Sequence, residues 1–117
     1  MVQITGLKSS PSQSFTINDP NGGGGIQFTL NYRPRVRSWF MDIAFGDFIM
    51  NGYKLTYGFN ILESYRNIIP FGLEVYSSDT ADPFLVDDFV SGRIELFLLT
   101  SAEVEGVAEW NKTVTIV

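Results

Sequence analysis

Apolar and polar residues alternate along much of this chain, and a period of two residues is typical of half-buried β-strands. In IQFTLNY, residues 26–32, the alternation would place four apolar side chains on one face: Ile26, Phe28, Leu30 and Tyr32. Similar patterns predict strands in SQSFTIND, WFMDIAFG and YKLTYGF, and PFGLEVYSS is predicted to form a further short strand. The nearly continuous apolar run of residues 94–99 predicts a central strand that is buried on both faces.

Glycine-containing turns separate the predicted strands. Asn51-Gly52 lies between two apolar runs and is the strongest short hairpin signal in the chain, so residues 39–50 and 53–60 are expected to be antiparallel neighbours. In DPNGGGG, proline, asparagine and glycine supply the backbone angles of a turn, which predicts a flexible hairpin tip. A phosphate-binding loop would need a lysine and a following helix, whereas the strand-like IQFTL follows here.

The remaining segments are less regular. NILESYRNII is expected to form a short helix or a turn before Pro70, and SDTADPFLVDDFVSG is expected to form a loop. SAEVEGVAEW could form a single helical turn capped by Ser101, and the tail KTVTIV could form an edge strand. The two loops are expected to carry apolar side chains into the core: Ile61, Leu62, Ile68, Phe84, Leu85 and Phe89.

These elements predict a single, mainly β domain over residues 1–117. The expected architecture is a compact antiparallel β-barrel or sandwich of about six to seven strands with little helix. No apolar run approaches the roughly 18 residues of a membrane span, so no membrane insertion is expected. MVQITGLKSS also lacks the basic start and apolar middle of a secretory signal.

The charge balance is acidic, with 13 Asp and Glu against 8 Lys and Arg and a net charge of −5. Binding to a phosphate backbone depends on clustered basic residues, so no direct binding of nucleic acid is expected. One basic cluster stands out, Arg33, Arg35 and Arg37, whose side chains would point the same way from an extended segment. We expect this face to be neutralised by nearby carboxylates or by a partner chain; the alternative is a patch for nucleic acid.

Catalytic chemistry has few candidates, because the chain contains no histidine and no cysteine. The commonest general base, the usual nucleophilic triads and cysteine zinc sites are therefore excluded, and the chain is predicted not to be an enzyme or to need a cofactor. The alternative is a small hydrolase that uses carboxylates alone, although nothing in the sequence pairs two of them. Four aspartates share one loop: Asp79, Asp82, Asp87 and Asp88. We interpret them as turn-forming residues; the alternative is a calcium site, although the spacing does not match an EF-hand.

Two further features concern packing. Arg93 opens the most buried predicted strand and is expected to pair with Asp87 or Asp88. Eight aromatic residues could line a sugar-binding platform: Trp39, Phe40, Tyr53, Tyr57, Phe59, Tyr65, Phe71 and Tyr76. Most of them fall on strand faces that ought to be core, so packing is the favoured interpretation, and any surplus would mark a subunit interface. A small ligand- or glycan-binding β module remains the alternative.

The ordered pieces of the chain resemble a family of small bacteriophage tail proteins, represented by the baseplate plug protein of a contractile-tailed cyanophage. The resemblance is carried by PSQSF, IQFTLNYRPRVRSWFMDI, NGYKLTYGFNIL, PFGL, the DPF of the acidic loop and DFVSGRIELFLLT with its following EV. It spans about residues 4–105 and leaves residues 106–117 as a C-terminal extension. The four-glycine turn and WNKTVTIV depart from the family pattern.

The resemblance implies a non-enzymatic virion protein of the central baseplate, which would help to close the hub and tail-tube channel before DNA is ejected. Its implied partners are other baseplate and tail proteins of the hub, tube and wedge, and a homo-oligomer about the tail axis is a further expectation. The residues expected at such interfaces are Arg33, Arg35, Arg37, Asp79, Asp82, Asp87, Asp88 and Trp110. The strand after Trp110 is expected to contribute with it.

Overall fold

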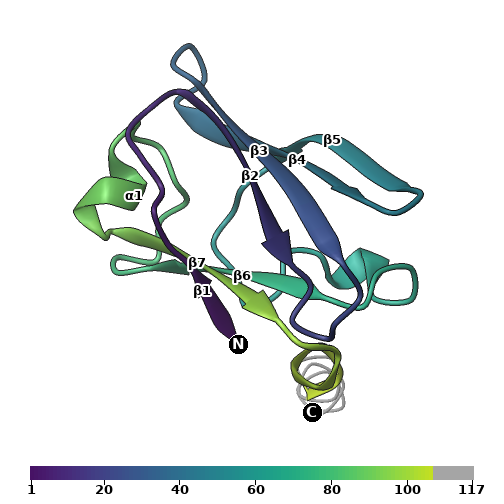
Figure 1. The fold of residues 1–117 in the computed structure, drawn as a ribbon. Helices are drawn as coiled ribbons and strands as arrows, with labels where there is room; N and C mark the ends of the chain where they lie inside the picture. Colours follow the sequence, from purple (N-terminus) through teal and green to yellow (C-terminus); the bar gives the residue numbers. More distant parts are fainter. Residues whose placement is uncertain (107–117) are drawn as a thin grey trace.

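The computed structural model describes residues 1–106 and arranges them as two antiparallel β-sheets (Figure 1). The four-stranded sheet has the order β2-β3-β4-β5, with β2 Ser12–Asn18, β3 Gly25–Arg33, β4 Ser38–Phe45 and β5 Phe48–Lys54. Because each strand pairs with the next one in the chain, this sheet is a simple meander joined by hairpin turns.

The three-stranded sheet contains strands from the beginning and from the end of the described chain. Its order is β1-β7-β6, with β1 Val2–Ile4, β6 Gly72–Ser77 and β7 Ile94–Leu99. The central position predicted for residues 94–99 is confirmed, although Glu95 and Phe97 on the outer face of β7 are half-buried rather than buried. The short strand β1 was not predicted, because its three residues are too few to show a period.

One hydrophobic core lies between the two sheets. Alternate apolar residues of β3 and β4 are buried, and those of β6 and β7 face them: Ile26, Phe28, Leu30, Trp39, Met41, Ile43, Leu73, Val75, Ile94, Leu96 and Leu98. Tyr32, which was predicted to share the buried face of β3, is only half-buried. The two sheets are separate and not closed on each other, so of the two predicted architectures the sandwich describes the molecule.

The predicted Asn51-Gly52 hairpin is wrong. The β4–β5 turn is Gly46-Asp47, where Phe45 pairs with Phe48 and Gly46 has a φ of 58°. A glycine in the first central position of a two-residue loop is itself a hairpin signal. Asn51 and Gly52 instead form a β-bulge opposite Asp42, whose Oδ1 accepts the Gly52 N–H at 2.6 Å.

Since the bulge lies inside β5, the strand predicted over residues 53–59 ends early, at Lys54. Leu55 is fully buried as expected, whereas Tyr57 is 41% exposed and Phe59 is 57% exposed. Gly58 forms an isolated antiparallel bridge with Val75, which brings this segment alongside the edge of β6. The two aromatic side chains therefore belong to the surface and not to the core.

Two short helices occupy the loops that were predicted to carry apolar side chains. The 3₁₀-helix η1, Glu63–Tyr65, lies in the first loop, where Leu62 is buried and Ile68 is 67% exposed, contrary to expectation. The helix α1, Asp88–Ser91, lies in the second, where Phe89 is buried while Phe84 and Leu85 remain exposed. In the first loop, Ile69 and Phe71 are buried in place of the neighbouring Ile68.

A further helix begins after β7, and residues 101–106 are helical. Its cap is Thr100 rather than the predicted Ser101: the Thr100 Oγ1 accepts the Glu103 N–H at 3.2 Å, and the Glu103 carboxylate accepts the Thr100 N–H at 2.9 Å. This reciprocal arrangement is a capping box. Trp110 and the predicted edge strand KTVTIV lie outside the described residues. No helix within residues 1–106 has the length and apolar character needed to cross a membrane.

The DPNGGGG segment is the β2–β3 hairpin tip, as predicted, and Asp19 organises it. Asp19 is 4% exposed, and its carboxylate accepts N–H groups of Asn21 and Gly23 at 3.0 and 3.1 Å. Asn21 then donates to the Pro70 carbonyl and accepts the Ser101 N–H, each at 2.9 Å. The tip is thus held against two distant segments of its own chain, a role that the glycine run did not reveal.

Candidate functional site

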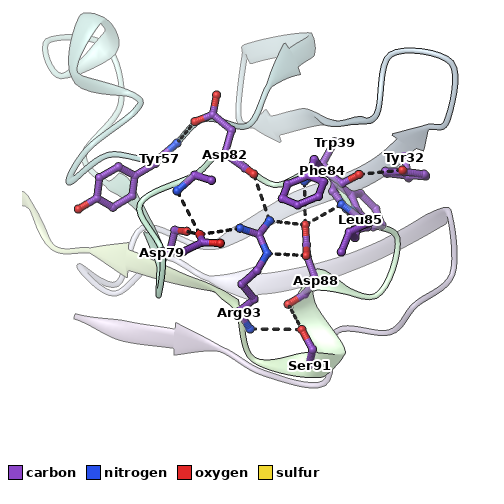
Figure 2. Close-up of polar contacts among 12 residues, drawn as sticks. Tyr32, Trp39, Tyr57, Asp79, Asp82, Phe84, Leu85, Asp88, Ser91 and Arg93 are labelled. Carbon is purple, nitrogen blue, oxygen red and sulfur yellow. Dashed lines mark hydrogen bonds and ion pairs between the residues drawn. The ribbon is translucent and has the colours of Figure 1, made fainter.

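The acidic loop between β6 and β7, residues 78–92, is built around Arg93 (Figure 2). The guanidinium of Arg93 donates to Asp88 through Nε at 2.8 Å and Nη2 at 2.6 Å, and to Asp79 through Nη1 at 2.8 Å. Its Nη2 also donates to the Asp82 carbonyl at 3.1 Å. The predicted pairing of Arg93 with a carboxylate of this loop is therefore confirmed for Asp88, and one planar cation closes the whole loop.

Asp88 is buried, with 1% of its side chain exposed, and it accepts hydrogen bonds from other groups besides Arg93. Its Oδ2 also accepts the backbone N–H groups of Phe84 and Leu85 at 2.7 and 2.8 Å. Burial by itself raises the pKa of Asp88, but the hydrogen bonds from Arg93 and from these two amides outweigh it and leave the pKa below its ordinary value. Asp88 is therefore a charged structural anchor of the loop.

The other aspartates of the loop have separate environments. Asp79 is exposed, and its pKa is lowered by hydrogen bonds from the Ser77 hydroxyl and the Ala81 amide and by Arg93. The Asp82 carboxylate accepts the Tyr57 N–H at 2.8 Å, whereas Asp87 is exposed at the start of α1 and makes no side-chain cap. Among residues 1–106, no group of three or more carboxylates is placed so that it could hold a metal ion.

The acidic loop is also fixed to the four-stranded sheet. The Tyr32 hydroxyl donates to the Phe84 carbonyl at 2.8 Å, and the Trp39 indole N–H donates to the Leu85 carbonyl at 2.9 Å. The ring of Phe89 packs edge-on against Trp39 with centroids 4.9 Å apart. The loop therefore links the two sheets, and nothing in the spacing of these residues along the chain could have predicted the contact.

The arginine cluster does not lie on an extended segment, so that expectation is wrong. β3 ends at Arg33, and residues 34–37 form the turn to β4, closed by the Val36 and Arg37 N–H groups donating to the carbonyls of Arg33 and Pro34. Arg37 has a φ of 48°, which fits a turn and not a strand. Pro34 could have signalled this turn, because proline cannot donate to a sheet ladder.

We call residues 33–37 the arginine tip. Arg33 lies over the ring of Phe40, 4.3 Å from its centroid. A surface hollow of about 520 Å³ is lined by Tyr32, Phe40 and residues 33–36 of the tip. Val36 at the end of the turn is 59% exposed. No ion pair found among residues 1–106 involves the three arginines. The three arginines therefore lie on a hairpin turn and not on the extended segment that the sequence predicted.

A second surface gathers aromatic side chains that sequence reasoning favoured as core. We call it the aromatic face: Tyr57, Phe59, Glu74, Tyr76 and Glu95. The Gly58–Val75 bridge brings Tyr57 and Phe59 beside β6, whose residues Glu74 and Tyr76 flank Val75. Tyr76 is 44% exposed, and its cross-strand partner on β7 is Glu95. Cross-strand partners share a face of the sheet, so aromatic rings and carboxylates alternate there.

A comparison with models of protein families gives a match over most of the chain. A family model described as cyanophage baseplate Pam3 plug gp18 matches residues 1–101 of the chain. Among curated proteins no match to the chain is found. The matched range includes both sheets, the arginine tip, the acidic loop and the aromatic face, and it ends at the start of the C-terminal helix.

Proposed function

The chain belongs to the family of cyanophage baseplate plug proteins, and on that premise we propose that it is a non-enzymatic structural protein of a contractile phage tail. In this proposal it is made in the host cytoplasm and assembled into the central baseplate. There it closes the channel formed by the hub and the tail tube until DNA is ejected. The family match over residues 1–101 is the observation that carries the proposal.

The surface chemistry of the chain supports assembly with other proteins. Large apolar side chains are exposed on several elements, including Val36, Ile49 and Ile68 at 59%, 67% and 67%. Ile49 and Ile68 border a hollow of about 540 Å³ beside the β4–β5 turn. Exposed apolar groups that lie together, as Ile49 and Ile68 do, are characteristic of surfaces that become buried in an assembly. The proposed partners are hub, tube and wedge proteins, with several copies of this chain arranged about the tail axis.

The acidic charge supports a place beside the DNA path without binding to DNA. At a net charge of −5 the chain repels a phosphate backbone over the range of the Debye length, about 8 Å at physiological salt. A plug with this charge would not retain the genome when the channel opens.

Cryo-electron microscopy of mature particles, together with mass spectrometry of purified tails, tests the proposal. The expected result is density for this chain on or near the axis of the central baseplate, and peptides from it in the tail fraction. Particles that assemble with the gene disrupted should lack that density and lose DNA prematurely. Absence of the chain from mature particles would contradict the proposal.

The aromatic face favours one second candidate, a glycan-binding module. Tyr57, Phe59 and Tyr76 are 41%, 57% and 44% exposed, and a row of exposed rings can stack on sugars. Binding of the purified chain to a glycan array, abolished by Tyr57→Ala/Tyr76→Ala, would support this candidate. An array without binding would count heavily against it.

A further inference from the structure

The arginine tip is a cationic surface on an acidic molecule. It carries three of the 8 basic residues of the whole chain within five positions, whereas the chain as a whole has a net charge of −5. The Asp79 and Asp88 carboxylates already pair with Arg93, at 2.8 and 2.6 Å. Within residues 1–106, no carboxylate forms an ion pair with the arginines of the tip.

The shape of the tip suits insertion into another surface. It is a hairpin turn that projects beyond the four-stranded sheet (Figure 1). The apolar Val36 is exposed between Arg35 and Arg37 in the chain. Backbone hydrogen bonds close the turn, and the stacking of Arg33 on Phe40 fixes one of the guanidiniums. A projection that is already ordered loses little conformational entropy on docking.

The aromatic face has the complementary chemistry. Tyr57, Phe59 and Tyr76 present ring surfaces, and Glu74 and Glu95 present carboxylates among them. Burial, and then the nearby Glu103, raise the pKa of Glu74, and the second cause reflects the proximity of two carboxylates at this end of the face. Arginine interacts favourably with both groups, since its planar cation stacks on aromatic rings and pairs with carboxylates.

The two surfaces cannot meet within one molecule. The aromatic face lies on the outer side of the three-stranded sheet, opposite the Val75 side that packs against the four-stranded sheet. The arginine tip extends from one end of the other sheet, away from β6 and β7 (Figure 1). Contact between them therefore requires a second copy of the chain.

We propose that the arginine tip of one copy docks on the aromatic face of the next copy. Arg35 and Arg37 lie against the rings of Tyr57 and Tyr76 and the carboxylate of Glu95, and Val36 packs between the rings. Such a contact is head-to-tail, because each copy uses two different surfaces, and head-to-tail contacts close into rings when the rotation between copies permits. The inference rests on the proposed function only for placing the ring about the tail axis.

Complementation between two variants of the full chain tests the contact. Arg35→Glu/Arg37→Glu removes the docking tip and keeps the face, whereas Tyr76→Ala/Glu95→Ala removes the face and keeps the tip. Wild-type protein is expected to sediment with a mass above 13.1 kDa that rises with concentration. Each variant alone is expected to self-associate at least about tenfold more weakly, since like charges or missing partners oppose docking. An equal mixture is expected to stop at a dimer, because only one intact contact is available.

Two controls separate the contact from folding and from overall charge. Lys8→Glu/Arg66→Glu makes the same charge change at exposed positions outside both surfaces and is expected to associate like the wild type. Arg35→Lys/Arg37→Lys keeps the charge without the planar guanidinium and is expected to be intermediate. Circular dichroism melting shows which variants fold.

Three results would overturn the inference: a wild type that remains a monomer, folded tip variants that associate normally, or a mixture of folded variants that does not dimerise. Any of these, with the chain still present in mature tails, would leave the proposed plug function intact. The second result, combined with loss of the same tip variants from particles, would assign the arginine tip to a contact with a different baseplate protein.

Discussion

At the scale of single residues, Arg93 organises the acidic loop, because its side chain contacts four residues of that loop: Asp79, Asp82, Phe84 and Asp88. Its side chain is 15% exposed, and that of Asp88 is 1% exposed. When one partner of such a buried ion pair is removed, the other charge stays buried without a partner, and the protein loses several kcal/mol of stability. Replacing both partners by apolar residues costs much less. The nearby cation–π contact with Phe84, 4.4 Å from the guanidinium carbon to the ring centroid, adds packing to the electrostatics.

Replacing this arginine tests the pairing directly. Arg93→Glu should lower the free energy of unfolding by about 3 kcal/mol or more, because a third carboxylate then faces Asp79 and Asp88. Urea denaturation followed by circular dichroism measures the change. Arg66→Glu, at an exposed site, should change stability by less than about 1 kcal/mol. The double variant Asp88→Asn/Arg93→Met should be more stable than Arg93→Glu, since it leaves no buried charge unpaired; an unchanged stability of Arg93→Glu would show that the pairing has no energetic weight.

The lowered pKa of Asp88 predicts an acid-sensitive step. A carboxyl whose pKa is lower in the folded state than its ordinary value of 3.8 stabilises the fold fully above that value. The contribution is lost as the pH falls through the lowered pKa, because the proton binds the unfolded chain more tightly. The free energy of unfolding should therefore fall steeply below about pH 4.

Denaturation curves between pH 7 and pH 2.5 measure this dependence. Asp88→Asn should flatten the acid limb, although it is less stable at neutral pH. Glu74 acts in the opposite direction, because its pKa is raised and its protonation favours the folded state. The comparison is therefore made in a Glu74→Gln background. An acid limb that is identical with and without Asp88→Asn would contradict the assignment.

At the scale of secondary structure, the chain contains two turn signals, one between β4 and β5 and one inside β5, and they form different structures. Gly46-Asp47 closes the hairpin and Asn51-Gly52 forms a bulge, so Met50 pairs with Ile43 and becomes buried at 8% exposure. Gly52 has a φ of 69°, and the Asp42 carboxylate fixes its N–H group. The bulge lets the strand continue to Tyr53, which packs on the core.

This use of Gly52 gives a prediction at the level of the strand pair. No atom lies within 4 Å of a Cβ added to Gly52, so a substitution meets backbone strain and no clash. Gly52→Ala should lower the free energy of unfolding by about 1 kcal/mol, whereas Gly52→Asn should cost less, because asparagine tolerates positive φ. Thermal melting of both variants measures the difference. Equal effects of alanine and asparagine would contradict a left-handed requirement at this position.

At the scale of the whole molecule, the acidic loop and the β2–β3 tip connect elements that are distant in sequence. Trp39 and Tyr32 hold the loop on the four-stranded sheet, while Arg93 anchors it at the start of β7. Asn21 links the hairpin tip to the helix that follows β7. The arginine tip and the aromatic face lie at separate places on the surface, as the proposed docking between copies requires.

The sequence by itself determined β2, β3, β4, β6 and β7 and most of their buried faces, since alternation is a local property and the core accepts only one face of each half-buried strand. It also predicted the β2–β3 turn, the Arg93 pairing and the clustering of the three arginines. The tertiary structure alone decided which glycine pair closes the β4–β5 hairpin, because strand register depends on pairing along the whole of β4. It likewise placed Tyr57, Phe59 and Tyr76 on the surface, since the Gly58–Val75 bridge joins segments that no local pattern connects.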